Sequence, residues 1–100
     1  MQKVNLAIQV LPFQNNPETP QDKYVIIDKA IALISESGLK HVVCPFETVV
    51  EGTYEEVMHL VEDIKHSCLL AGADDLIINL KLHAKKEGDA LMHDKLEKYS

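Results

Sequence analysis

Apolar and polar residues alternate in two stretches near the ends of the chain, which is the pattern of a strand with one buried face. In the first stretch the apolar positions are Val4, Leu6, Ile8 and Val10. In the second they are Leu76, Ile78, Leu80 and Leu82. We therefore predict strands over 4–11 and 76–83, and we expect Pro12 to end the first because proline donates no ladder hydrogen bond.

Two longer stretches repeat apolar residues at helical spacing. Thr19 as N-cap, Pro20 at the first helical position and Gly38 as a stop predict a helix over about 20–37. Thr53 and Glu56 have the capping-box spacing, and they predict a second helix that ends at Gly72. The two apolar stripes are Tyr24, Ile27, Ile31 and Ile34, then Val57, Leu60, Val61, Ile64, Cys68 and Ala71. A short helix over about 90–99 is expected to close the chain.

Between the helices, residues 40–52 predict two short strands around a bend. The apolar pairs Val42-Val43 and Val49-Val50 flank Cys44-Pro45-Phe46, where proline favours a corner. Strand alternation places Glu47, Val49 and Glu51 on one face, with Thr48 and Val50 on the other. Two acids on one sheet face indicate that this face is wet or binds a cation.

The order strand, helix, strand, strand, helix, strand predicts a ferredoxin-like β-α-β-β-α-β sandwich, an α+β fold with a four-stranded antiparallel sheet. Both main helices would cover one face, and no helix would be left for the other. That second face alternates apolar and polar side chains, which suits a second sheet and hence a homo-oligomer. Its residues are Asn5, Ala7, Gln9, Leu11, Glu47, Val49, Glu51, Ile77, Asn79, Lys81 and His83.

The chain length and the charged residues exclude several classes of partner and ligand. A chain of 100 residues is expected to form one domain, spanning 1–100. The net charge of −6 disfavours a nucleic-acid partner. Every basic residue is a lysine, so the bidentate fork that clamps phosphates is missing and a cationic or neutral ligand fits better.

No apolar run reaches the ~20 residues of a membrane span, and no signal-peptide core follows Met1, so we expect no membrane partner and a cytoplasmic location. Cys44 and Cys68 are then expected to be reduced thiols.

Candidate binding groups gather on the uncovered sheet face. Gln9, Asn79 and Lys81 can share it with the two carboxylates, and such a set could pair donor for acceptor with a flat nitrogen heterocycle. The alternative from the residues alone is hydrogen bonding across an oligomer interface. Cys44 has only His41 nearby as a base, on the opposite side of the strand, so a packing role is expected for the thiol and no catalysis. The five histidines lack ligand spacing, so no metal site is expected.

The motifs Val-Asn-Leu-Ala-Ile-Gln-Val-Leu-Pro and Ser-Gly-Leu-Lys-His-Val-Val-Cys-Pro-Phe-Glu-Thr-Val-Val-Glu-Gly resemble the thiamine-binding family that includes the YkoF-type proteins. The family pattern is roughly Gly-Pro-Met-x-Thr-x-Ile/Val-Glu-Gly. Pro45, Thr48, Glu51 and Gly52 match it, whereas Cys44 replaces the glycine and Phe46 the methionine.

The resemblance implies the ferredoxin-like fold, subunits packed sheet to sheet in dimers or tetramers, and binding of thiamine or its hydroxymethylpyrimidine moiety without catalysis or a cofactor. The site is then expected on the sheet face at a subunit interface. The residues predicted to bind the ligand are Gln9, Cys44, Phe46, Glu47, Thr48, Glu51 and Asn79. The alternatives are a structural or regulatory homo-oligomer with no small ligand and, third, an enzyme.

Overall fold

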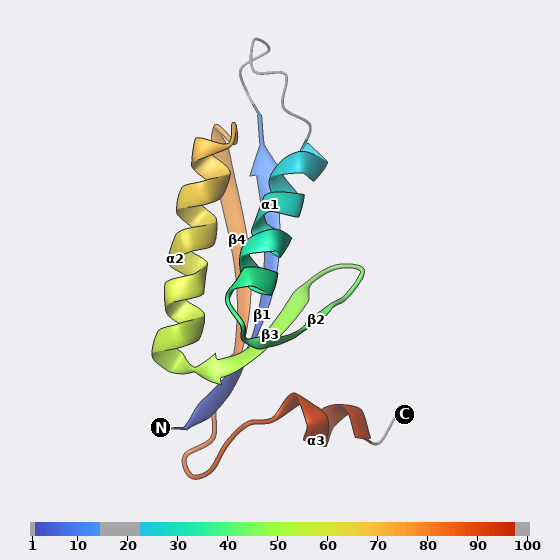
Figure 1. Ribbon diagram of the computed structural model, residues 1–100, viewed down its shortest axis with the longest axis vertical. Helices are drawn as coiled ribbons and strands as arrows, with labels where there is room; N and C mark the ends of the chain where they lie inside the picture. Colours follow the sequence, from blue (N-terminus) through green and yellow to red (C-terminus); the bar gives the residue numbers. More distant parts are fainter. Residues whose placement is uncertain (1, 15–22, 98–100) are drawn as a thin grey trace.

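The computed structural model of the chain describes residues 2–14 and 23–97. These residues form a four-stranded antiparallel sheet in the order β2-β3-β1-β4, with helices in the predicted order (Figure 1). The ferredoxin-like α+β fold is therefore confirmed. The elements are β1 (Lys3–Phe13), α1 (Lys23–Glu36), β2 (Lys40–Val43), β3 (Thr48–Thr53), α2 (Tyr54–Leu70), β4 (Asp75–His83) and α3 (Met92–Leu96).

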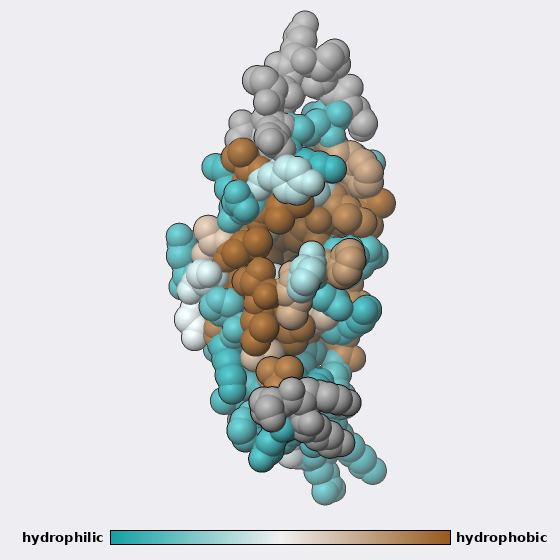
Figure 2. Space-filling view, turned by 90° about the vertical axis from the view of Figure 1, so that its right-hand side faces the viewer, coloured by the Kyte–Doolittle hydropathy of each residue, from teal (hydrophilic) through white to brown (hydrophobic). Residues whose placement is uncertain are grey.

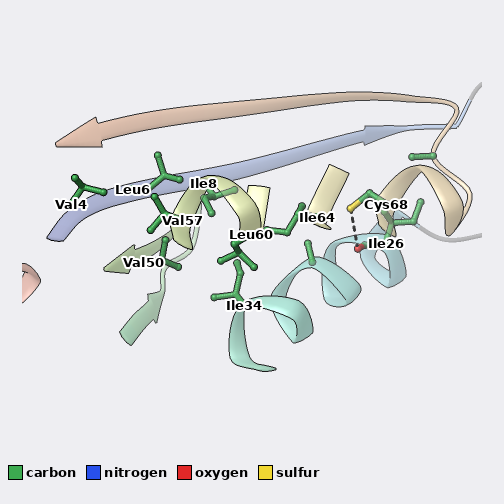
Figure 3. Close-up of a cluster of buried hydrophobic side chains, with 12 residues drawn as sticks. Val4, Leu6, Ile8, Ile26, Ile34, Val50, Val57, Leu60, Ile64 and Cys68 are labelled. Atoms are coloured by element: carbon green, nitrogen blue, oxygen red, sulfur yellow. Dashed lines mark hydrogen bonds between the residues drawn. The ribbon is translucent and has the colours of Figure 1, made fainter. Parts of the chain in front are cut away.

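The core lies between the sheet and the two long helices, α1 and α2, which run side by side over one face (Figures 1 and 3). Leu6 on the central strand pairs with Val50 of β3 and Leu82 of β4, so these apolar residues share the helix side of the sheet. The predicted burial holds for β1 but only in part for β4, where Leu80 and Leu82 are 39% and 49% exposed at the edge of the sheet. Cys68 is fully buried beside Ile26, and burial raises the pKa of its thiol. The cluster consists of Val4, Leu6, Ile8, Ile26, Ala30, Ile34, Val50, Val57, Leu60, Ile64, Cys68 and Ala73.

The predicted capping box at the start of α2 is present. The Thr53 backbone N–H donates to Glu56 Oε1 at 2.9 Å, and the Glu56 backbone N–H donates to Thr53 Oγ1 at 3.3 Å. The hydrogen bond from the Thr53 backbone lowers the pKa of Glu56. Gly52 precedes this cap, and a Cβ atom there would lie 3.1 Å from Leu39 Cδ2 and 3.3 Å from Glu56 Oε1. A larger residue at this motif position would therefore crowd the capping carboxylate.

The expected end of the first strand at Pro12 is wrong, because β1 continues to Phe13. Pairing of β1 with β3 stops at Ile8 and Thr48, while pairing with β4 runs on to Phe13 and Asp75. The last part of β1 therefore has one neighbour only, and a residue without an N–H is tolerated at such an edge. The first helix is described from Lys23, so its predicted start at Pro20 lies outside the described residues.

The expectation that no helix covers the second sheet face is also wrong. After β4 the chain turns back, and α3 lies near one end of the sheet (Figure 1). Hydrogen bonds from this segment to Asn5 and Glu51 place it over that end of the second face. Ala90 N–H donates to the Lys3 carbonyl at 3.0 Å, and Asn5 Nδ2 donates to the Ala90 carbonyl at 2.5 Å. Ala90 and Met92 are buried by this contact. Val42, Cys44 and Val49 line a small hollow together with Met92 and Leu96, so α3 also reaches this side of the sheet. The part of the face around Asn79 and Lys81 is left exposed by the described residues.

Candidate functional site

A cavity opens where β3 leaves the edge of β1. It has a volume of about 300 Å³ and lies between β1 beyond Ile8, the apolar side of α1 and the bend at 44–48. The backbone of Cys44 donates to the Glu47 carbonyl at 2.9 Å, which closes this bend and fixes its shape. Figure 2 faces the side that carries α1 and the bend, and shows hydrophobic side chains gathered in a band along its middle. The cavity therefore has an apolar wall that suits a flat ring.

A second hollow of about 220 Å³ adjoins it on the open sheet face. Its lining is Gln9, Phe46, Glu47, Asn79 and Lys81, of which the first three also line the larger cavity. Asn79 Nδ2 donates to Gln9 Oε1 at 3.1 Å, and Lys81 Nζ donates to Glu47 Oε1 at 3.3 Å. The two hollows together combine an apolar slot with an amide pair and an ion pair.

The strand register explains how these side chains meet. Gln9 pairs with Asn79, which places their amides side by side. Lys81 pairs with Ala7, and the methyl group of Ala7 leaves room for the lysine to reach over β1 towards Glu47. Lys81 was placed on this face by alternation but was not among the predicted ligand-binding residues. Its contact with Glu47 depends on the strand order and the small Ala7, which the local pattern of β4 does not reveal.

Six of the seven residues predicted to bind the ligand line these hollows. Cys44 and Thr48 lie in the larger cavity and Asn79 in the smaller, while the remaining three border both. Thr48 is buried on the opposite side of the strand from its neighbour Glu47, at the helix end of the slot. Phe46 stands at the corner with 84% of its surface exposed. An aromatic ring this exposed is free to pack on a ligand or on another subunit.

Glu51 lines neither hollow. It lies four residues further along the chain from Glu47, about 13 Å in an extended strand. Its side chain is buried, and its Oε1 accepts a hydrogen bond from the Met92 backbone N–H at 2.6 Å. Beside it, buried Asn5 accepts from Lys95 Nζ at 3.2 Å through its Oδ1. The structure therefore connects Glu51 to the docking of α3 and separates it from the other predicted site residues.

The histidine and the thiol near the bend have separate local partners. His41 Nδ1 lies 2.9 Å from the Leu39 carbonyl, and Cys44 Sγ lies 3.9 Å from the Val42 carbonyl. Cys44 and Cys68 are free thiols. Over residues 2–14 and 23–97, no group of three His, Cys, Asp or Glu side chains is arranged to hold a metal ion. None of the helices in these same ranges is long and apolar enough to cross a membrane.

The fold and the hollows define a ferredoxin-like domain with a ligand-sized depression on its sheet face. The chain belongs to the family of thiamine-binding proteins, whose pattern matches residues 6–100. It is 31% identical to the UPF0045 protein CPE1503 of Clostridium perfringens, over 99% of both chains. The resemblance drawn from the two motifs is thereby confirmed, and membership supports a role in binding a small molecule.

Solved structures agree with this assignment. A domain of unknown function, DUF77, from Bacillus cereus is 28% identical with a TM-score of 0.91, covering 99% of this chain and 91% of that one. A Thermotoga maritima protein, named as a candidate for thiamine biosynthesis or salvage, is 31% identical with a TM-score of 0.83, covering 98% of this chain and 99% of that one. The similarity extends over nearly the whole chain in both comparisons.

Proposed function

We propose that this protein binds thiamine or its hydroxymethylpyrimidine moiety, without catalysing a reaction on it, in the two adjoining hollows around Gln9 and Glu47. The observation that carries the proposal is the meeting of the Gln9–Asn79 amide pair with the Glu47 carboxylate beside an apolar slot. Family membership supplies the ligand class.

The chemistry of an aminopyrimidine matches these groups. Its ring carries an exocyclic amine donor beside ring-nitrogen acceptors, and a carboxylate with a free oxygen can accept from the amine. The amide pair leaves Gln9 Nε2 as a donor and Asn79 Oδ1 as an acceptor. A hydrogen bond to the charged Glu47 contributes about 1.5–3 kcal/mol, and one to each neutral amide contributes about 0.5–1.5 kcal/mol. Together with burial of the ring in the apolar slot, these bonds support micromolar affinity after the ligand is immobilised.

A second copy of the chain completes the site in this proposal. A small ligand is usually buried over most of its surface, and these hollows are open on the sheet face. The same face carries exposed Ile77 next to the hollow, and Phe46 stands at its border. Sheet-to-sheet packing into dimers or tetramers would cover both residues and enclose the ligand. A cytoplasmic location belongs to the same proposal, because two free thiols suit a reducing compartment.

Titration calorimetry on folded, ligand-free protein tests the proposal. Thiamine and free hydroxymethylpyrimidine should each bind and compete with one another, and thiamine diphosphate should bind more weakly because no arginine receives its phosphates. Glu47→Gln should weaken pyrimidine binding about tenfold by removing a charged acceptor of the same shape. Glu87→Gln, an exposed acid after β4, makes the same change in net charge and should have no effect. Absence of heat and of competition with both ligands would favour a structural or regulatory oligomer instead.

A further inference from the structure

The small hollow between α3 and the strands β2 and β3, here called the α3 hollow, lies outside the proposed ligand site. Its volume is about 140 Å³. Most of its wall is apolar and comes from Val42 and Val49 of the strands and from Met92 and Leu96. Val42 is 38% exposed and Leu96 is 52% exposed, so the hollow opens at the surface. An apolar cavity of about 150 Å³ takes up a benzene ring, so the α3 hollow has the size and character for one aromatic side chain.

The polar side chains in the lining of the α3 hollow already have partners. Asn5 Nδ2 donates to the Ala90 carbonyl at 2.5 Å, and Lys95 Nζ donates to Asn5 Oδ1 at 3.2 Å. The Lys95 ammonium is thereby held beside Asn5, and its aliphatic stem is left for the wall. The Cys44 thiol also lines the hollow, and such a sulfur makes favourable contacts with aromatic rings. An aromatic ring can therefore enter without leaving a buried polar group unsatisfied.

Phe46 is a side chain of this protein that suits the α3 hollow. Its ring stands at the bend between β2 and β3, is 84% exposed and does not line the hollow of its own chain. Because Cys44 lines the hollow, the ring is only two residues along the chain from the wall. A two-fold axis at this place would bring each ring to the hollow of the other chain. Such a contact uses the same surface on both copies and closes at two subunits.

We propose that Phe46 of one copy inserts into the α3 hollow of a second copy, and the reverse, as the anchor of a two-fold dimer. The contact specifies the second copy that the proposed function calls for, and it does not depend on which ligand binds. Aromatic side chains that fill a pocket of the partner are typical anchors of protein interfaces. Phe46→Ala removes two such anchors from each dimer and should raise the Kd of the dimer about 10²- to 10³-fold.

Photo-crosslinking locates the contact. The probe is p-benzoylphenylalanine in place of Phe46 and, as a control, in place of Phe13, an exposed ring at the end of β1. Each probe protein is mixed with heavy-isotope-labelled wild type, left to exchange subunits and irradiated. Mass spectrometry should find the probe at position 46 joined to Met92 or Leu96 of the heavy chain, and the probe at position 13 joined to neither.

Sedimentation measures the strength of the contact. Leu96→Ala removes part of the wall in both copies and should raise the Kd of the dimer about tenfold or more. Leu70→Ala makes the same change at the exposed end of α2, outside the α3 hollow, and should leave the Kd unchanged. Urea unfolding checks that each variant is intact.

Two results would overturn the inference: no crosslink from position 46 to α3 of the heavy chain, or an unchanged Kd in both Phe46→Ala and Leu96→Ala. Calorimetry with thiamine on the same wild-type protein keeps the proposed function separate. Thiamine binding without the crosslink leaves the ligand site standing and removes this dimer contact. The crosslink without thiamine binding supports the dimer contact and removes the proposed ligand.

Discussion

Replacement of Glu51 tests whether this motif residue binds the ligand or holds α3 against the sheet. Glu51 is 7% exposed and its carboxylate accepts from the Met92 N–H at 2.6 Å, so loss of the carboxylate should release α3 before it affects a ligand. Glu51→Gln keeps an acceptor but loses the charge, and should destabilise the protein by about 1 kcal/mol. Glu51→Ala leaves the buried Met92 N–H without an acceptor and should cost about 2–3 kcal/mol.

Thermal and urea unfolding measure this effect. For a domain of this size, a loss of about 1 kcal/mol lowers Tm by about 4–8 °C, and wild type and variants should be compared at one protein concentration because association also shifts Tm. Trypsin should cut after the exposed Lys95 faster in both variants, because α3 opens more often. Glu87→Gln is the control for charge.

Unchanged Tm and unchanged cleavage in Glu51→Ala would refute the assignment of Glu51 to α3. Loss of pyrimidine binding at full stability would return Glu51 to the ligand-binding set, and the hollows would have to extend under α3. The two measurements together therefore decide between the predicted role of this residue and the one that the geometry supports.

Three further predictions follow from the fold. Thr53→Ala should destabilise the protein by about 1 kcal/mol in urea unfolding at pH 7. The pKa of Glu56 is lowered from its usual 4.5, first by the Thr53 backbone N–H, so the contribution of the Glu56 carboxylate is present above that value and is lost as the pH falls through the lowered pKa; a stability difference between wild type and Glu56→Gln that stays the same at pH 2 would contradict this. Cys44→Ala should leave ligand affinity within about tenfold of wild type in calorimetry, because the thiol supplies volume and no charge; abolished binding with the fold intact would mean direct participation. Ile77→Asp should shift the protein towards monomer in sedimentation, and a wild type that is already monomeric at micromolar concentration would exclude the sheet-to-sheet oligomer.

The local patterns predict most of the fold because they report burial directly. Leu6 and Ile8 alternate with smaller or polar residues because one side of β1 meets the helices. Thr53 and Glu56 satisfy each other's backbone N–H groups within one turn. The two errors, at Pro12 and over the second sheet face, concern which neighbour a strand has at each point. That depends on β3 diverging from β1 and on the chain returning after β4, and neither has a local signal.

The candidate site, like the fold, was predictable only in part. Alternation is enough to place Gln9, Glu47 and Asn79 on one face. It does not reveal that Glu51 is covered, because the Met92 N–H comes from a segment 41 residues away. Nor does it reveal the contact between Glu47 and Lys81, which reaches over the intervening strand β1. The sequence pattern therefore predicts which side chains share a face of the sheet. Their hydrogen-bond and ion-pair partners depend on the strand register and on the path of the segment after β4, which the pattern does not predict.

The attachment of the first strand to the last segment also sets the order in which the chain can fold during synthesis. β1 leaves the ribosome first, yet its neighbours β3 and β4 begin at Thr48 and Asp75, and its contacts with Asp89 and Ala90 span 86 and 85 residues. At a synthesis rate of roughly 5–20 residues per second, the apolar side of β1 stays unpaired for about 4–16 s until these partners have been made. Contacts of such long range form slowly, so we expect the sheet to close only after β4 and residues 89–90 have been synthesised. Until then, the strand that becomes the centre of the sheet is the part of the nascent chain most exposed to aggregation and to chaperones.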